Sequence, residues 1–284
     1  MTTRPDRPCP PLPGRASTYG EPMNAYAEFR DLHRTGAPLV LPNAWDHASA
    51  AALATAGFRA VGTTSLGVAS AAGKSDAAGG TRDETVALAL GLARMDALVS
   101  VDVEGGFSED PDEVAALART LAQAGVAGVN IEDGRPDGGL ADRDHQCAVI
   151  RAVKRAAPDL FVNARTDTHW LPGTGEDTTA RATAYQEAGA DGVFVPGLRE
   201  EKAISALVDA LDVPLNVLYA PGAPSLRTLA DLGVRRVSCG SLLFRAALRA
   251  TVATALAVAE DLPVQDGLPT YAEADALAGL FEEG

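Results

Sequence analysis

The chain has 284 residues, of which 46% are hydrophobic and 22% are charged, and its formal net charge is −14. This length fits one large domain or two small ones, and single α/β barrels commonly reach it. The negative charge argues against nucleic acid or an anionic membrane as a partner, because both favour a basic face. An anionic substrate is compatible with it, since a few local cations or a metal ion reverse the field of a pocket.

The two ends of the chain differ in composition from its middle. Residues 1–22 are rich in proline, arginine and small polar residues and lack the apolar core of a signal peptide. We expect a disordered tail there, followed by one domain over residues 23–284 that includes a C-terminal helical extension. The most apolar long stretch, 242–258, contains two arginines, which favours an amphipathic or buried helix over a membrane span.

The three cysteines, Cys9, Cys147 and Cys239, lie far apart and show no spacing typical of a metal site. This pattern indicates free thiols in a reducing compartment, and we expect the protein to be cytoplasmic.

Short apolar runs alternate with alanine-rich segments of helical periodicity. We predict strands over residues 38–42, 59–63, 97–103, 127–131, 160–164, 191–195, 213–218 and 234–238. Most of them are continuously apolar, as expected of parallel strands that are covered on both faces. The segment 110–125 is typical of the predicted helices, with Asp110 as N-cap, Pro111 in the first turn and Gly125 at the end. Eight such units predict a (β/α)₈ TIM barrel. The first predicted strand is not followed by a GxGxxG motif, which argues against a dinucleotide-binding sheet.

Acidic side chains follow the third and fourth predicted strands, and active sites of such barrels lie at the carboxyl ends of strands. Asp102 and Glu104 are two residues apart, so an extended backbone would point them the same way. With Glu132 they would bring three carboxylates together, and charges that close require compensation. Oxygen ligands without His or Cys favour Mg²⁺ or Mn²⁺ over Zn²⁺. The alternative is that these acids are loop caps and surface charges, but their shared position favours a metal site.

Several segments resemble the isocitrate lyase/phosphoenolpyruvate mutase superfamily, and the resemblance covers about residues 38–250. They read NAWDHASAAALATAGFRAVGTTSLGVASAAGKSD, VDVEGGF, AGVAGVNIEDG, VNARTD and EAGADGVFVPG. The resemblance extends to the carboxyvinyl-carboxyphosphonate phosphorylmutase-like or oxaloacetate decarboxylase-like subgroup. It implies a (β/α)₈ barrel that binds Mg²⁺ and a small 2-oxo acid. It also implies a homotetramer, a dimer of dimers that exchanges its last barrel helix, with which a helical tail at about 241–260 and 270–282 is compatible.

The resemblance assigns roles to individual positions. Asp102 matches the direct metal ligand, and three further acids match residues that hold the metal largely through its waters: Asp76, Glu104 and Glu132. The loop that grips the substrate carboxylate is matched by Thr64, Ser65 and Leu66, and the substrate-binding arginine by Arg165. Arginine at this position suits bidentate capture of a carboxylate. Glu104 is a departure, because many members have Asp there. At other strand ends, the candidates for substrate binding are Trp45, Asp46 and Asn216.

Two further departures narrow the expected chemistry. Isocitrate and 2-methylisocitrate lyases carry a KKCGH-type loop after the fourth strand, whereas here the loop reads EDGRPDGGLADRDHQ and has no Cys or Lys. Phosphonopyruvate-type mutases and hydrolases use a His where this chain has Pro196. Cysteine-dependent cleavage and phosphoryl migration are therefore both disfavoured.

We expect an Mg²⁺-dependent lyase or decarboxylase that cleaves a small 2-oxo or 2-hydroxy dicarboxylate through an enolate. Arg165 would orient the substrate, and the candidates for proton donor are His145, Asp137, Asp142 and Tyr219. For His145, the pattern favours a solvated surface histidine at a helix start over a proton donor. The loop 134–145, with its DGG turn, is either a closing lid or a plain surface turn.

The remaining alternatives keep the barrel and change its chemistry. One is hydrolytic C–C cleavage, as in an oxaloacetate hydrolase, and another is C–P bond chemistry of the phosphonopyruvate type. A ketopantoate hydroxymethyltransferase-like aldol enzyme and a non-catalytic metabolite-binding barrel also remain open. His169 and Trp170 would line the pocket, or Trp170 would pack at a subunit interface.

Overall fold

The computed structural model describes residues 24–171 and 177–281, so the tail predicted over residues 1–22 lies outside the described residues. Within those ranges, nine strands form one parallel sheet in the order β1-β9-β8-β7-β6-β5-β4-β3-β2. They are β1 (Leu39–Leu41), β2 (Asn43–Ala44), β3 (Ala60–Thr63), β4 (Leu98–Asp102), β5 (Gly128–Glu132), β6 (Phe161–Arg165), β7 (Gly192–Val195), β8 (Leu215–Leu218) and β9 (Arg236–Ser238). The predicted TIM-type barrel is confirmed.

The first predicted strand, over residues 38–42, ends at Pro42, and the short strand β2 that follows the proline accounts for the ninth strand. Before the proline, the carbonyl of Leu41 accepts from the N–H of Cys239 (3.1 Å), beside β9. At the proline, the carbonyl of Pro42 accepts from the N–H of Gly62 in β3 (2.8 Å). Proline has no N–H to continue a ladder, so the chain changes its pairing partner there. This change closes the barrel.

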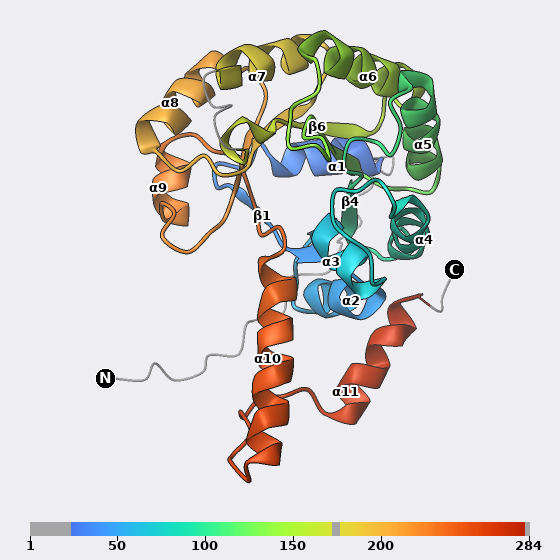
Figure 1. Ribbon diagram of the computed structural model, residues 1–284, viewed down its shortest axis with the longest axis vertical. Helices are drawn as coiled ribbons and strands as arrows, with labels where there is room; N and C mark the ends of the chain where they lie inside the picture. The colour runs from blue at the N-terminus through green and yellow to red at the C-terminus, as the bar shows by residue number, and fades with distance from the viewer. Residues whose placement is uncertain (1–23, 172–176, 282–284) are drawn as a thin grey trace, which may run out of the picture.

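Helices surround the strands in an arc from α4 to α9 (Figure 1). The helices of the barrel are α1 (Ala25–Leu32), α2 (His47–Thr55), α3 (Ser65–Ala71), α4 (Arg82–Leu92), α5 (Pro111–Gln123), α6 (Arg143–Ala156), η1 (Asp167–His169), α7 (Thr178–Glu187), α8 (Glu201–Ala210) and α9 (Leu226–Asp231). The predicted capping of α5 is confirmed, because the side chain of Asp110 accepts from the N–H of Asp112 (2.9 Å). Gly125 follows this helix at a φ of +94°, where glycine is favoured.

The largest apolar cluster lies between the strands and the outer helices. It joins Val101 of β4 and Val129 of β5 to Leu121 of α5, Ile150 of α6 and Tyr185 of α7. Burying a side chain of this size contributes about 1.5–3 kcal/mol relative to leaving it exposed. The cluster therefore fixes α5, α6 and α7 against the strands whose ends carry the predicted site.

α1 closes the end of the barrel opposite to the predicted site. Its Phe29 ring meets Phe161, at the start of β6, edge to face at 5.3 Å, and His33 stacks on Phe161 at 4.6 Å. Burial, together with the charge of Arg236, lowers the pKa of His33 to about 3, so this imidazole is neutral. The barrel is thus plugged at its amino end.

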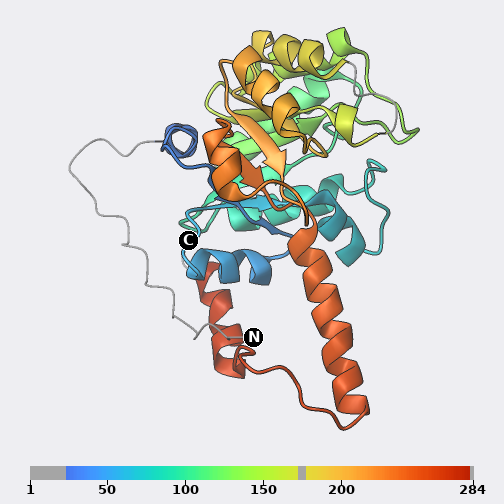
Figure 2. The same ribbon diagram turned by 90° about the vertical axis from the view of Figure 1, so that its left-hand side faces the viewer.

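The C-terminal helices leave the barrel, as Figures 1 and 2 show. α10 (Leu242–Ala259) extends away from it, followed by α11 (Tyr271–Asp275) and η3 (Ala276–Phe281), which return to α2, where Phe281 meets His47 edge to face at 4.9 Å. Phe244 is buried and Leu242 and Leu243 are half-buried, whereas the large apolar side chains farther along α10 are exposed: Leu248, Val252, Leu256 and Val258. The helix is long and apolar enough to cross a membrane, which is weak evidence when a single helix meets this criterion. Its exchange between subunits stays a prediction.

Candidate active site

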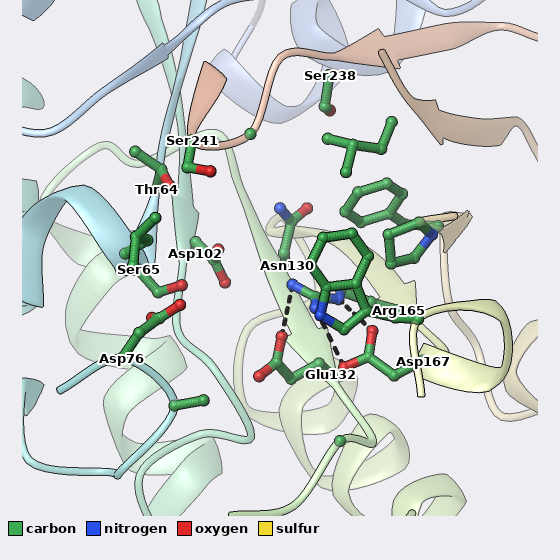
Figure 3. Close-up of a pocket in the computed structure, with 18 of the residues that line it drawn as sticks. Thr64, Ser65, Asp76, Asp102, Asn130, Glu132, Arg165, Asp167, Ser238 and Ser241 are labelled. Carbon is green, nitrogen blue, oxygen red and sulfur yellow. Dashed lines mark hydrogen bonds and ion pairs between the residues drawn. The ribbon is translucent and has the colours of Figure 1, made fainter. Parts of the chain in front are cut away.

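A cavity of about 340 Å³ lies at the carboxyl ends of the barrel strands (Figure 3). Its polar side includes predicted site residues from β3 to β6 and the segment after α3: Thr64, Ser65, Asp76, Asp102, Glu132 and Arg165. Its other side is apolar and comes from the ends of β6 to β8: Trp170, Leu171, Phe194, Pro196 and Leu218. Seven predicted site residues meet in this cavity, because Leu66 lines it as well.

Two buried acids lie on neighbouring strands of the cavity. Asp102 ends β4 and Glu132 ends β5, and both side chains are almost fully buried. Burial raises the pKa of Asp102 to about 6 and that of Glu132 to about 8, and the charge of Arg165 acts in the opposite direction on both. Oδ1 of Asp102 also accepts from the N–H of Glu104 at 3.4 Å. Such carboxylates favour a cation beside them, because it compensates for lost hydration.

Arg165 is the cation that faces these acids. Its Nη1 lies 2.7 Å from Oε2 of Glu132, and its Nε and Nη2 donate to the carboxylate of Asp167 at 2.6 and 3.1 Å (Figure 3). The guanidinium also lies 5.7 Å from the centre of the Phe194 ring, on the apolar side of the cavity. Glu132 and Asp167 together therefore hold the Arg165 guanidinium in the lining of the cavity.

Glu104 does not lie as an extended backbone predicts. β4 ends at Asp102, and Glu104 has a φ of +50°, in the left-handed region. Its carboxylate accepts from the N–H of Gly79 (3.1 Å) and the hydroxyl of Thr81 (2.7 Å). The expectation that Glu104 points the same way as Asp102 is wrong, because the chain turns after the strand. Glu104 instead lines an adjoining cavity of about 230 Å³. Its hydrogen bonds to Gly79 and Thr81 hold the loop that follows Asp76 in place.

The segment Thr64–Leu66 forms the start of α3, as a carboxylate-binding loop would. Thr64 is the N-cap residue, and its side chain makes no capping hydrogen bond. Its backbone is extended and the helix begins at Ser65, so the first N–H groups of the helix belong to residues that line the cavity. Gly67 lies against Trp45, since a Cβ at this glycine would clash with the Trp45 side chain. This close approach fixes the position of α3.

Four predicted residues at strand ends line neither cavity. Asp46 is the N-cap of α2, where it forms a capping box with Ser49, and Trp45 packs against Phe244 of α10 at 5.3 Å. Asn216 is buried in β8 and exchanges hydrogen bonds with Ser238. Tyr219 is 40% exposed beyond β8.

His145 lies on α6 and lines neither cavity, but its Nε2 lies 3.4 Å from Glu109, which lines the smaller cavity. Two other candidate proton donors stabilise turns in the 134–145 loop. Asp137 accepts from the N–H of Gly139 (2.9 Å), and Asp142 caps α6. Roles for these three residues in proton transfer stay predictions.

The sequence reasoning missed two polar residues of the cavity. Asn130 lines it from β5, where its Oδ1 accepts from Asn163 (2.8 Å) and Arg236 (3.3 Å). Its signal was its position two residues before Glu132, on the same face of a strand. Arg135 lines both cavities, and its Nε lies 3.3 Å from the exposed Glu109. No pattern in the sequence distinguishes Arg135 from a surface arginine.

The donor set of the cavity fits a hard divalent cation. Asp76, Asp102 and Glu132 offer carboxylate oxygens, and two of them are buried with raised pKa values. In the described ranges, no three His, Cys, Asp or Glu side chains converge closely enough to form a metal centre by themselves. This arrangement suits a cation that keeps several of its waters, as Mg²⁺ does, better than one enclosed by protein ligands.

A parallel barrel with buried acids beside Arg165 at the carboxyl ends of its strands is typical of an enzyme of the (β/α)₈ type. The chain belongs to the phosphoenolpyruvate phosphomutase family, whose model matches residues 29–259. This match confirms the superfamily that the sequence motifs indicate.

Relatives of this chain include proteins of assigned and unassigned activity. An uncharacterized protein of Mycobacterium tuberculosis is 44% identical over 250 residues, which are 87% of this chain and 95% of the relative. An oxaloacetate decarboxylase of Pseudomonas entomophila is 33% identical over 238 residues, 78% of this chain and 81% of the relative. A solved structure of oxaloacetate acetylhydrolase with the product oxalate has a TM-score of 0.80 and 26% identity, covering 92% of this chain and 96% of that one.

Proposed function

We propose that the chain is an Mg²⁺-dependent carbon–carbon lyase that decarboxylates or cleaves a small 2-oxo or 2-hydroxy dicarboxylate. The observation that carries this proposal is the meeting of Asp102, Glu132 and Asp76 with Arg165 in one cavity. The similarity to oxaloacetate decarboxylase over most of both chains supports the same reaction class. C–C cleavage beside a 2-oxo group leaves an enolate, so the site must stabilise negative charge.

Asp102 would hold Mg²⁺, or Mn²⁺, directly, whereas Asp76, Glu104 and Glu132 would hold it through its waters. Bound there, the metal would supply Lewis-acid polarisation of the substrate oxygens. The contacts of Glu104 with Gly79 and Thr81 fit an indirect role, because they fix the loop that carries Asp76.

The chain's own residues would orient the substrate and exclude water. Arg165 would bind one substrate carboxylate with its fork of N–H groups, and the start of α3 at Thr64–Leu66 would supply further donors. The apolar side of the cavity, with Trp170 and Phe194, would keep water from the enolate side. His145 and Tyr219 line neither cavity, so a role for them as proton donors requires the loops to close.

The second candidate is a C–C hydrolase. The similarity to oxaloacetate acetylhydrolase favours it, and the cavity with its adjoining smaller cavity has room for a water molecule. Chemistry of the phosphonopyruvate type is less well supported, because Pro196 lines the cavity and offers no side-chain nucleophile or base. A non-catalytic barrel would not account for the buried acids beside Arg165.

The assembly that we propose is a homotetramer in which α10 packs on a second copy. Leu248, Val252 and Leu256 of this helix are more than half exposed in the single chain. A contiguous apolar helix face of this kind marks an interface. We place the enzyme in the cytoplasm, where free thiols such as those of Cys147 and Cys239 persist.

Product analysis tests the proposed reaction. Purified protein with Mg²⁺ would be offered oxaloacetate, 2-methylisocitrate, 2,3-dimethylmalate and phosphonopyruvate, with Asp102→Ala as the control. We expect a dicarboxylate to be consumed, with pyruvate and CO₂ as the products of oxaloacetate, and the control to be inactive. Oxalate and acetate would instead establish the hydrolase, and inactivity on all four compounds would contradict the proposal.

A further inference from the structure

A chain of hydrogen bonds leads from Arg165 away from the cavity. The carboxylate of Asp167, which holds the guanidinium, belongs to the first residue of the 3₁₀ turn η1. The N–H of Asp167 donates to Oδ1 of Asp133 at 2.8 Å. Asp133 lies directly after Glu132, the other acid that pairs with Arg165. Both acids that hold Arg165 are therefore connected to Asp133, one through a hydrogen bond and the other through the backbone.

Asp133 is fully buried, and α7 supplies its other donors. The hydroxyl of Tyr185 donates to Oδ2 of Asp133 at 2.6 Å, and Nη1 of Arg181 lies 3.2 Å from the same oxygen. Arg181 also donates to the carbonyl of Ala141 at 2.9 Å, while the N–H of Ala141 donates to the carbonyl of Asp133 at 2.7 Å. A buried carboxylate with this many charge-assisted contacts has one favourable orientation, because any other leaves it unsatisfied.

Gly134 transmits the position of Asp133 to Asp167 by contact. A Cβ at residue 134 would overlap with Oδ2 of Asp167, so the carboxylate lies directly against this backbone. A shift of the backbone after β5 therefore displaces the carboxylate on which Arg165 rests. Close packing of this kind transmits small displacements.

We propose that Asp133, fixed by Tyr185 and Arg181, is a positioning residue that sets the direction of the Arg165 guanidinium. Neither Tyr185 nor Arg181 lines either of the two cavities described above, so they would act on the substrate through this hydrogen-bonded chain. The inference rests on the proposed function, because it takes Arg165 as the group that binds the substrate carboxylate. α7 thereby contributes to substrate binding through Arg181 and Tyr185, which lie 16 and 20 positions beyond Arg165 in the sequence.

The chain offers a matched pair of variants for a test. Tyr185→Phe removes one hydroxyl that donates to Asp133, and Tyr26→Phe removes one that donates to Asp191 at 2.7 Å, at the amino end of the barrel. Calorimetric titration with oxalate in Mg²⁺ buffer measures carboxylate binding without turnover. We expect Tyr185→Phe to raise the Kd for oxalate about tenfold and Tyr26→Phe to leave it within about twofold, at comparable losses of Tm.

The same variants separate this inference from the proposed function. We expect Tyr185→Phe to raise the KM for oxaloacetate more than it lowers kcat, because the lost interaction acts on binding. Equal Kd values in the two variants, with a wild type that turns over oxaloacetate, would overturn the inference and leave the function standing. A wild type without turnover whose oxalate binding still weakens in Tyr185→Phe would overturn the function and leave the inference standing.

Arg181→Lys covers the case in which Tyr185→Phe does not fold. It keeps the positive charge of α7 but loses the planar group that reaches both Asp133 and the carbonyl of Ala141. We expect a smaller rise of the oxalate Kd, about threefold to fivefold. An unchanged Kd in a folded Arg181→Lys protein would contradict the positioning role.

Discussion

Arg165 lies directly opposite Glu132 in the register of β6 and β5, and its Nη1 is 2.7 Å from Oε2 of that acid. The cation that we propose to bind the substrate is thus paired with an acid of the proposed metal site. A cation bound by Glu132 would compete with Arg165 for this carboxylate, which couples metal binding to the availability of the guanidinium. The cavity is therefore one connected charge system rather than two separate sites.

Arg165→Lys tests the need for a forked cation. Lysine keeps the charge but contacts only one of the two acids at a time, and it cannot bind a carboxylate with two parallel hydrogen bonds. We expect kcat/KM to fall about 100-fold, or about 2.7 kcal/mol. Steady-state kinetics would measure it, with Arg151→Lys on the exposed face of α6 as the control. Equal kcat/KM values in the two variants would contradict the proposal that Arg165 binds the substrate carboxylate.

The raised pKa values of Asp102 and Glu132 predict the pH dependence of Mg²⁺ binding. Below about 6 and about 8, respectively, these carboxyls hold protons that must leave before a cation binds. We expect Mg²⁺ affinity, measured by titration calorimetry, to rise between about pH 5.5 and about pH 8.5.

Glu132→Gln separates the two titrations. This variant should lose the upper part of the rise and keep the lower part, which belongs to Asp102. A wild-type affinity that is independent of pH over the whole range would contradict the assignment of both carboxyls to the metal site.

The hydrogen bond from Thr81 to Glu104 predicts a link between loop stability and metal binding. Thr81→Val leaves the buried Glu104 carboxylate with only the N–H of Gly79 as donor. We expect a loss of about 1–3 kcal/mol in the free energy of unfolding and weaker Mg²⁺ binding, because the loop carrying Asp76 loosens. Thr120→Val is the control, since Thr120 is exposed and bonds only within α5. Unchanged Mg²⁺ affinity in Thr81→Val would show that the Glu104 contact has no bearing on the metal.

A single charge on α10 tests the proposed assembly. Leu256 is 54% exposed in the isolated chain and would be buried against a second copy. We expect Leu256→Glu to convert a tetramer into smaller species, because an unpaired charge in an apolar interface is strongly unfavourable. Light scattering during gel filtration measures the mass. Leu226→Glu, at the start of α9, is the control at similar exposure, and an unchanged tetramer in Leu256→Glu would contradict the interface.

Local patterns predict the barrel and most of its polar end. Buried parallel strands read as apolar runs, and the acids or arginine that follow them fall at one end by topology. The expected direction of the Glu104 side chain is wrong, because the alternation of side chains holds only within a strand and β4 ends two residues earlier. The missing N–H of Pro42 predicts an interruption of strand pairing at this residue. The sequence does not show that the chain pairs with β9 before the proline and with β3 after it.

Contacts between distant residues lay beyond the reach of the sequence. Tyr185 and Asp133 are 52 positions apart, and nothing near either residue marks the hydrogen bond between them. Asp46 and Asp142 are acidic residues that follow strands, as site residues do, yet each caps a helix. A short polar side chain before a helix serves both purposes, and only the fold distinguishes them.

The most direct test of the account is pyruvate release from oxaloacetate by the wild type and by Asp102→Asn, each with Mg²⁺ and with a chelator. Asn keeps the shape of Asp102 but lacks the charge that the cation requires. We expect Mg²⁺-dependent release by the wild type, a loss of about 1000-fold or more in Asp102→Asn, and no release with the chelator. Equal release by both proteins, or wild-type release that survives the chelator, would contradict it.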